Sequence, residues 1–349
     1  MPQCLFMGRK AVSMENADLR VTVLEEGGHI AEVFSKRAQV NPLWIPDWPS
    51  VEPSSYSQAA YPHFGGGPDA KLLAGIMGHN LCLDLFGGPS QAEAAAGMTT
   101  HGESSVNPYT IRQVGESIRM SLHLPLAQLN FTRTLELQEG SLLIRESVEN
   151  LTAADRPLAW TQHVTLAPPF LDPATTQFRA SMTHSVVSDT DPGEQMYLKP
   201  GEPFEWPFAP RNDGGAADLR AMNAHAPASA YTAHVSDETR DDAFFLAFSP
   251  RHQLAFGYVW KRSDFPWLGI WEETCSRRWS PWNSRTIARG MEFGVSPFPE
   301  TRVAMIERGK LLGRPTFRWL PALAKLEVEY WAITQHGVKA PETLERPPS

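Results

Sequence analysis

Four short segments of the sequence concentrate histidine, acidic and tryptophan residues beside glycine and proline. They are residues 78–103, 159–170, 264–282 and 289–300. This mixture is expected where strands end in loops around a polar pocket. Imidazole and carboxyl groups are the side chains best suited to proton transfer near neutral pH, so general acid–base chemistry is the first hypothesis to test.

Segment 78–103 holds two histidines and several acidic residues. His79 and Asp84 fit a structural role in turns as well as a functional one, whereas His101, next to a glycine, is better placed to face a cavity. We take four residues here as candidate substrate-binding groups: His79, Asp84, His101 and Glu103. They lack the tight spacing of a metal-binding motif, and the chemistry considered below needs no metal or other cofactor.

Segments 159–170 and 264–282 combine a histidine with an unusual density of tryptophan. His163 lies within a strand-like run, where a histidine hydrogen-bonded in the core is the competing interpretation. An indole can cover the C–H face of a sugar ring while acids and amides bind its hydroxyl groups, although the same residues also suit a large core. The candidate substrate-binding residues from these two segments are Trp160, Trp271 and Glu272.

Glu292 is a carboxylate within an apolar, strand-like run. Burying an unpaired carboxylate is costly, so such a group is either paired or holds a raised pKa suited to proton transfer. A salt bridge to Arg285 or Arg289 is the alternative. Glu292 and His163 are the candidate catalytic residues.

The elements that must position these residues are predicted to be β-strands. Apolar and polar residues alternate in segments 19–23, 118–124, 129–137 and 325–330, and segment 129–137 continues across Glu139-Gly140 into 141–148 as a hairpin. Strands with one buried and one exposed face indicate antiparallel sheets. With 30 prolines and 25 glycines among 349 residues, many short strands are favoured over long helices.

Composition and charge restrict the partners and the compartment. The net charge is −8 and the basic residues are dispersed, which argues against a nucleic-acid partner. We find neither a signal-peptide core nor an 18-residue apolar run, so a cytoplasmic protein without a membrane partner is expected. Three widely spaced cysteines, Cys4, Cys82 and Cys275, favour reduced thiols over a disulfide framework.

The chain shows no clear domain boundary. We expect one β domain over residues 1–336, followed by a proline-rich tail over 337–349 that is poorly ordered or lies along the surface. Segments 41–70 and 192–230 are predicted to be long loops, which in a compact domain usually cover or build a site.

The order of the motifs resembles that of the aldose 1-epimerase, or galactose mutarotase-like, superfamily. The motifs are Gly27-Gly28-His29-Ile30-Ala31, His101 before a glycine, His163 before a hydroxyl-bearing residue and an apolar stretch, and Met291-Glu292-Phe293 leading to Pro297-Phe298-Pro299. The likeness runs from about residue 15 to about residue 335, and the longer strings around these motifs resemble a divergent, largely uncharacterised branch.

The resemblance implies a supersandwich of antiparallel sheets with a sugar bound in a cleft on one sheet. It implies that Glu292 is the base on the anomeric hydroxyl and His163 the acid on the ring oxygen, with His101 binding the sugar or sharing the acid role. The arginine that the family places upstream of its first histidine has no clear counterpart near Gly75. The family's mid-chain aspartate has only Asp237 as a positional candidate.

Three functions remain open from the sequence. The leading one is an isomerase that interconverts the anomers of a free or modified sugar. A glycoside-cleaving enzyme would instead pair Glu272 or Glu273 with Glu292, and a binding module would keep the cleft without catalysis. The expected partner is a sugar or oligosaccharide. Its identity, its phosphorylation and the oligomeric state are not encoded in these motifs.

Overall fold

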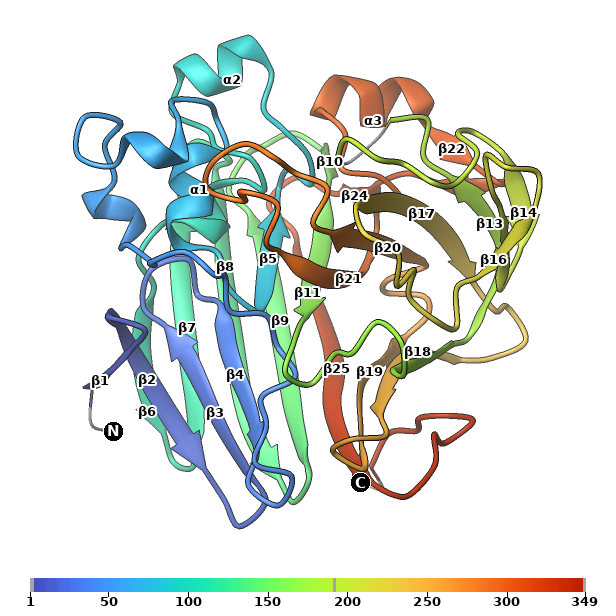
Figure 1. The fold of residues 1–349 in the computed structure, drawn as a ribbon. Coiled ribbons are helices and arrows are strands. Elements are labelled where there is room, and N and C mark those ends of the chain that lie inside the picture. Colours follow the sequence, from blue (N-terminus) through green and yellow to red (C-terminus); the bar gives the residue numbers. More distant parts are fainter. Residues whose placement is uncertain (1–2, 191–192, 348–349) are drawn as a thin grey trace.

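Two large antiparallel sheets form the body of the protein (Figure 1). The computed structural model describes residues 3–190 and 193–347. Every pairing between neighbouring strands of the two sheets is antiparallel in this part of the chain, and the α-helices are only five to seven residues long. The predicted all-β class with few short helices is confirmed.

The larger sheet has eleven strands in the order β1-β2-β3-β4-β5-β11-β21-β20-β17-β13-β14. In that order the strands are β1 (Gln3–Phe6), β2 (Arg9–Glu15), β3 (Leu19–Leu24), β4 (Ile30–Ser35), β5 (His79–Leu83), β11 (Trp160–Leu166), β21 (Ile287–Gly294), β20 (Trp267–Thr274), β17 (Ala228–Ser236), β13 (Met182–Val187) and β14 (Pro203–Glu205). Strands β5 and β21 flank β11, so segments far apart in sequence meet at the centre of this sheet.

The second sheet has eight strands in the order β12-β18-β19-β25-β9-β8-β7-β6. They are β12 (Gln177–Ala180), β18 (Asp242–Ser249), β19 (Leu254–Lys261), β25 (Lys325–His336), β9 (Ser141–Asn150), β8 (Leu129–Gln138), β7 (Ser117–Leu124) and β6 (Thr110–Val114). Short pairs are formed by β10 (Arg156–Leu158) with β24 (Arg318–Leu320), β15 (Phe208–Pro210) with β16 (Ala216–Asp218), and β22 (Lys310–Leu311) with β23 (Arg314–Pro315).

The helices gather at one end of the sheets, at the top of Figure 1. They are α1 (Ala70–Gly75), α2 (Gln91–Ala95) and α3 (Arg302–Arg308), with the 3-10 turns η1 (Pro53–Ser55), η2 (Pro62–Phe64) and η3 (Glu103–Ser105). The loop between β20 and β21, in orange, crosses the same end. This end of the molecule carries long connections, which in a compact domain usually cover or build a site.

The strands predicted from alternation are all present. Segments 19–23, 118–124 and 325–330 lie in β3, β7 and β25, and β8 pairs with β9 through the Glu139-Gly140 turn. Alternation succeeds here because each of these strands buries one face between the sheets.

The two predicted loops differ in outcome. Segment 41–70 holds only η1, η2 and the first residue of α1, so it is a loop. For segment 192–230, described from 193 onward, the loop prediction is wrong in part because β14, β15, β16 and the start of β17 lie within it. These strands have at most three residues each before β17, too few to show a two-residue period.

The C-terminal segment follows the surface of the eight-stranded sheet as far as it is described. Leu344 is buried against Phe244, Leu246 and Val259, and Arg346 Nη2 donates to Asp242 Oδ1 at 2.5 Å. Arg179 Nε of β12 also lies 3.7 Å from Glu342 Oε2, so an apolar anchor and two ion pairs hold this segment against the sheet.

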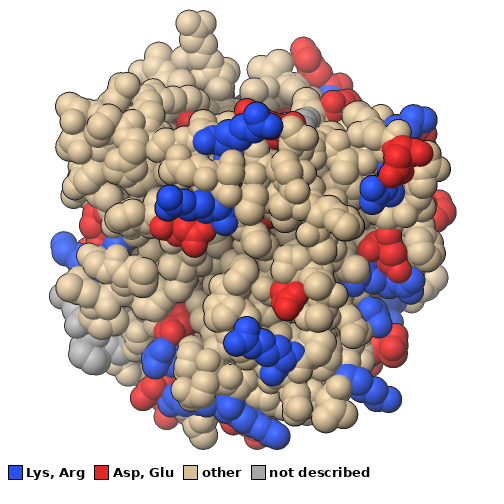
Figure 2. Space-filling model, viewed as in Figure 1, with Lys and Arg blue, Asp and Glu red and all other residues tan. Residues whose placement is uncertain are grey.

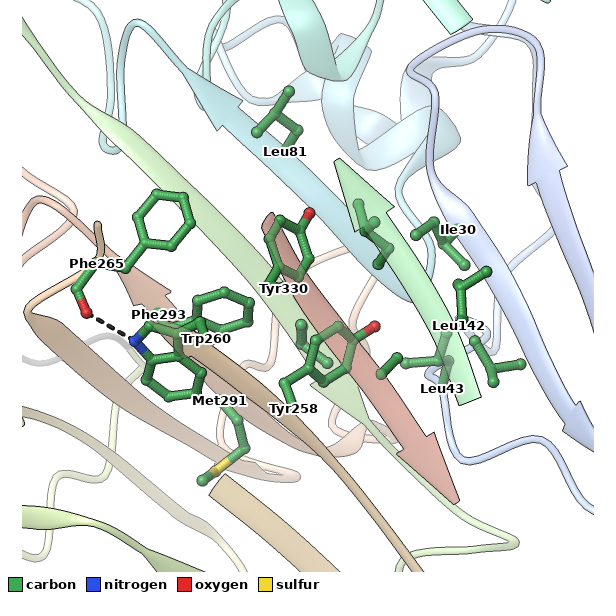
Figure 3. Packing of buried hydrophobic residues seen from close by; sticks show 14 of the residues in the cluster. Ile30, Leu43, Leu81, Leu142, Tyr258, Trp260, Phe265, Met291, Phe293 and Tyr330 are labelled. Atoms are coloured by element: carbon green, nitrogen blue, oxygen red, sulfur yellow. Dashed lines mark hydrogen bonds between the residues drawn. The ribbon is translucent and has the colours of Figure 1, made fainter. Parts of the chain in front are cut away.

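The space between the sheets is filled by large apolar and aromatic side chains (Figure 3). Trp260 and Phe293 stack with ring centroids 4.3 Å apart, and Trp260 Nε1 donates to the Phe265 carbonyl at 2.7 Å. Phe293 projects from β21 toward this core, so Glu292 beside it must project to the opposite face of the sheet.

A polar network is buried within the same core, around Glu146 of β9. Its carboxylate accepts from Arg133 Nε at 2.7 Å, Tyr330 Oη at 2.7 Å, Gln162 Nε2 at 2.6 Å and Trp160 Nε1 at 3.0 Å. Arg133 and Glu146 are both fully buried. The network joins β8, β9, β25 and β11, so it ties the two sheets together.

Lys and Arg on the face shown in Figure 2 are scattered among Asp and Glu and do not form one patch. Much of the upper part of this face carries neither charge. None of the helices in the described residues has the length and apolar character needed to cross a membrane.

Candidate active site

A cavity of about 370 Å³ opens on the face of the eleven-stranded sheet that points away from the core. Its size is typical of small-molecule sites. It is lined by Trp44, Pro68, Asp69, Leu72, Leu73, Ile76, Phe86, Thr100, His101, His163, Tyr231, Trp271, Arg277, Trp279, Trp282, Glu292 and Pro299. Strands β11, β17, β20 and β21 supply the floor, and the long loops supply the walls.

His163 and Glu292 meet at the floor of this cavity. They are opposite each other in the pairing of β11 with β21, and both project to the same face. His163 Nε2 lies 3.1 Å from Glu292 Oε1, and the side chains are only 9% and 2% exposed. The fixed backbone register therefore holds an imidazole and a carboxyl group at hydrogen-bonding distance.

Burial shifts the proton affinities of this pair in opposite directions. Desolvation raises the pKa of Glu292 to about 8, although the hydroxyl of Tyr231 and the charge of Arg277 oppose the rise. Desolvation also holds the pKa of His163 well below its ordinary value, with a smaller contribution from His101. At neutral pH the pair therefore shares one proton, which the two shifts favour on Glu292.

Tyr231 of β17 fixes the second oxygen of Glu292. Its hydroxyl donates to Glu292 Oε2 at 3.0 Å, and both groups are buried. Two glycines make room for this arrangement: a Cβ at Gly269 would lie 2.1 Å from the Tyr231 hydroxyl, and one at Gly290 would lie 2.5 Å from Glu292 Oε1. Only glycine allows the two polar groups to settle against the sheet.

His101 faces the same cavity from the loop after α2. Its ring centroid lies 4.9 Å from that of His163, and its Nδ1 donates to the Phe86 carbonyl at 2.6 Å. Burial lowers the pKa of His101 to about 4, so the ring is neutral at physiological pH. With Nδ1 protonated, Nε2 is a hydrogen-bond acceptor for a ligand hydroxyl.

Several buried polar atoms on this face have no hydrogen-bond partner among the described residues. They are Trp271 Nε1, Asn80 Oδ1 and Thr161 Oγ1. Trp271 lines the cavity, whereas Asn80 is opposite His163 in the pairing of β5 with β11. Buried donors are usually satisfied in folded proteins, so the indole N–H of Trp271 is available to a polar group that enters the cavity.

Arg277 and Tyr231 are cavity residues that no sequence motif identifies. Arg277 lies 4.3 Å over the Trp282 ring and 5.0 Å over the Trp271 ring, and its Nε is 3.5 Å from Glu273 Oε2. Arg277 belongs to the tryptophan-rich segment 264–282, which is the one signal that pointed toward it. Tyr231 lies in a strand that carries no motif.

The predicted residues His101, His163, Trp271 and Glu292 converge on the cavity, whereas five others do not. His79 and Trp160 belong to the core network, because His79 Nε2 donates to Gln162 Oε1 and Trp160 Nε1 donates to Glu146. Their strand positions point toward the second sheet. The prediction that these two bind substrate is corrected accordingly.

Asp84 and Glu103 are also placed away from the cavity. Asp84 forms ion pairs with Arg156 and Arg302, and Glu103 accepts from the backbone amides of Leu126 and Ala127. Each carboxylate is buried and satisfies nearby cationic or backbone donors, so a structural role replaces the predicted binding role.

The prediction that Glu272 binds substrate is also corrected. It follows Trp271 on β20 and therefore faces the core, where it pairs with Arg289 at 3.1 Å and accepts from Tyr197 Oη at 2.6 Å. Glu273 shares the face of Trp271 but accepts from Ser276 Oγ at 2.8 Å and does not line the cavity. Neither residue supplies a second carboxylate for glycoside cleavage.

Two further sequence hypotheses can be placed. Arg289, considered as a salt-bridge partner of Glu292, pairs with Glu272 instead. Asp237 accepts from Thr239 in an exposed turn and does not line the cavity. The described residues contain no group of three or more His, Cys, Asp or Glu side chains arranged to hold a metal ion.

The sequence matches no protein-family model, and no curated protein matches it. Solved structures do match across nearly the whole chain. A candidate aldose 1-epimerase from Klebsiella pneumoniae superposes with a TM-score of 0.65 at 14% identity, covering 95% of this chain and 80% of that one. The Slr1438 protein from Synechocystis gives 0.62 at 12% identity, covering 96% and 100%.

A galactose mutarotase-like protein from Clostridium acetobutylicum gives a TM-score of 0.60 at 11% identity, covering 96% of this chain and 98% of that one. At such identities the likeness concerns the fold. The chain therefore has the all-β fold of the galactose mutarotase-like proteins, as the order of its motifs predicts.

Proposed function

We propose that the protein is an aldose 1-epimerase-like isomerase that interconverts the anomers of a sugar. The observation that carries this proposal is the contact of His163 with Glu292 at the floor of a tryptophan-lined cavity. Anomer exchange requires one group that accepts a proton from O1 and another that donates a proton to O5. The pair provides both, while His101 Nε2 and Trp271 Nε1 are available for the sugar hydroxyls.

In this mechanism the Glu292 carboxylate removes the proton from O1 as the C1–O5 bond breaks and the C1–O1 double bond forms. The His163 imidazolium gives its proton to O5. Rotation about C1–C2 and reversal of the two transfers close the ring as the other anomer. The reactive form, a Glu292 carboxylate with a His163 imidazolium, carries one proton on the pair. The form with a neutral carboxyl and a neutral imidazole also carries one. Transfer of that proton from Glu292 to His163 therefore produces the reactive form without proton exchange with solvent.

The test is mutarotation of freshly dissolved α-aldoses, followed by polarimetry or by proton NMR of the anomeric signals. We expect the protein to accelerate equilibration, and His163→Ala to lose about 10²- to 10⁴-fold of that acceleration because it removes a general acid. His123→Ala is the matched control, since His123 is exposed on β7 outside the cavity.

Other outcomes would favour other functions. Release of reducing ends from a glycoside would support hydrolysis. Saturable sugar binding without mutarotation would support a binding module, and in either case the isomerase proposal fails.

The pH dependence of mutarotation should reflect the loss of the one proton that Glu292 and His163 share. We expect kcat/KM to be flat up to about pH 8 and to fall tenfold per pH unit above it, because the pair then loses its proton. Tyr231→Phe removes the hydroxyl that favours the carboxylate, so the pKa of Glu292 and the alkaline limb should both move upward. An alkaline limb that stays in place in the variant would contradict this role of Tyr231.

A further inference from the structure

The cavity has a buried floor and an exposed rim. The floor holds the acid–base pair with Tyr231 and Trp271, all of them buried. The rim includes Trp279, which is 45% exposed although it lines the cavity, together with the exposed Pro68. A ligand that reaches the floor must therefore pass an open aromatic surface.

Backbone hydrogen bonds within its loop hold the main chain at Trp279. Its carbonyl accepts from the Asn283 amide at 3.0 Å, and the Arg277 carbonyl accepts from the Ser284 amide at 2.8 Å. An exposed indole at the mouth of a cavity leaves its apolar face open to a ligand that enters. Its flat face suits the C–H face of a pyranose ring.

The half-buried Asp69 and Thr100 lie on the cavity wall and add an acceptor and a hydroxyl group. They complement Trp279 in the way that a sugar requires, with an apolar surface for the ring face and polar groups for the hydroxyls. The wall thus offers contacts to a ligand in addition to those at the acid–base pair.

The charges of the lining argue against a phosphorylated ligand. Arg277 is the one Lys or Arg among the described lining residues, and it already contacts Glu273 at 3.5 Å. The same lining carries the carboxyl groups of Asp69 and Glu292. Phosphate groups are generally bound by several cationic or backbone donors, so this cavity is suited to a neutral ligand.

From these features we infer that the substrate is a neutral reducing oligosaccharide, with its reducing ring at the floor and its second ring stacked on Trp279. This inference rests on the proposed function. In a pyranose ring C4 lies opposite C1, so when C1 faces Glu292 and His163 a substituent at O4 points toward the rim. A substituent at O2 lies next to the reacting carbon and would meet the floor.

The experiment compares mutarotation of glucose, maltose (1→4-linked), sophorose (1→2-linked) and glucose 6-phosphate. We expect kcat/KM for maltose to exceed that for each of the others by about tenfold or more. Trp279→Ala should lower the value for maltose about tenfold, mainly through KM, and lower the value for glucose by a clearly smaller factor. Trp319→Ala is the matched control, because Trp319 is 59% exposed and does not line the cavity.

The possible outcomes separate failure of the oligosaccharide inference from failure of the isomerase function on which it rests. Equal rates for glucose and maltose, or an equal loss for both sugars in Trp279→Ala, would overturn the inference while leaving the isomerase intact. Preference for glucose 6-phosphate would overturn the neutral-substrate assignment. Absence of mutarotation with every sugar would overturn the proposed function itself.

Discussion

Glu292→Gln is expected to reduce mutarotation by about 10²- to 10⁴-fold while leaving the fold intact. Glutamine keeps the shape of the side chain and can still accept from Tyr231 at the position of Oε2. It cannot accept the proton of O1, so the step that opens the ring loses its base. Polarimetry with saturating sugar measures the loss, and sugar binding followed by tryptophan fluorescence should persist because the cavity keeps its lining.

The same variant has a second signature in its stability. The pKa of Glu292 is raised from the ordinary value of 4.5 to about 8, so between these values the folded protein holds a proton that the unfolded chain releases. The free energy of unfolding of the wild type should therefore fall as pH rises from 4.5 to 8, by an amount on the order of a few kcal/mol. Glutamine does not titrate.

The difference in stability between Glu292→Gln and the wild type should accordingly grow in favour of the variant over this pH window. Urea unfolding at a series of pH values measures it. A difference that stays constant from pH 4.5 to pH 8 would show that Glu292 titrates normally, and the shared-proton mechanism would then lose its basis.

Glu146→Ala is expected to lower the free energy of unfolding by about 3–5 kcal/mol or more, the cost of breaking a buried ion pair. The change leaves the guanidinium of Arg133 buried without its counter-ion. It also removes the acceptor of Tyr330, Gln162 and Trp160, whose donors become unsatisfied. Urea denaturation measures the effect.

Glu136→Ala is the matched control for this prediction. Glu136 pairs with Arg145 on the outer face of the same sheet, where the two side chains are 35% and 50% exposed. Because water screens such a pair, the expected loss is below about 1 kcal/mol. Similar losses in the two variants would contradict the assignment of the Glu146 network as a main connection between the sheets.

Much of the architecture can be predicted from the sequence. Strands such as β7 and β8 alternate because one face is buried, and the Glu139-Gly140 hairpin joins neighbours in sequence, so local patterns suffice. The short strands within 192–230 escape this approach because two or three residues carry no period. Their pairing is decided by the segments beside them, such as β13 next to β14.

The candidate site could be predicted only in part. His101, His163 and Glu292 belong to motifs whose order is informative, and the structure brings them together. Arg277 and Tyr231 have no local signature, because their roles arise from contact with residues on other strands. His79 and Asp84 have the composition of site residues but are held by core and loop partners.

Glu272 and Glu292 separate what the sequence determines from what the tertiary structure decides. Each is a carboxylate in a buried strand, and alternation establishes that neighbours such as Trp271 and Glu272 face opposite sides of their strand. Which side is the core depends on the second sheet, whose strands come from distant parts of the chain. That packing turns Glu272 toward Arg289 and Glu292 toward His163, so the tertiary structure decides which acid is neutralised and which can transfer a proton.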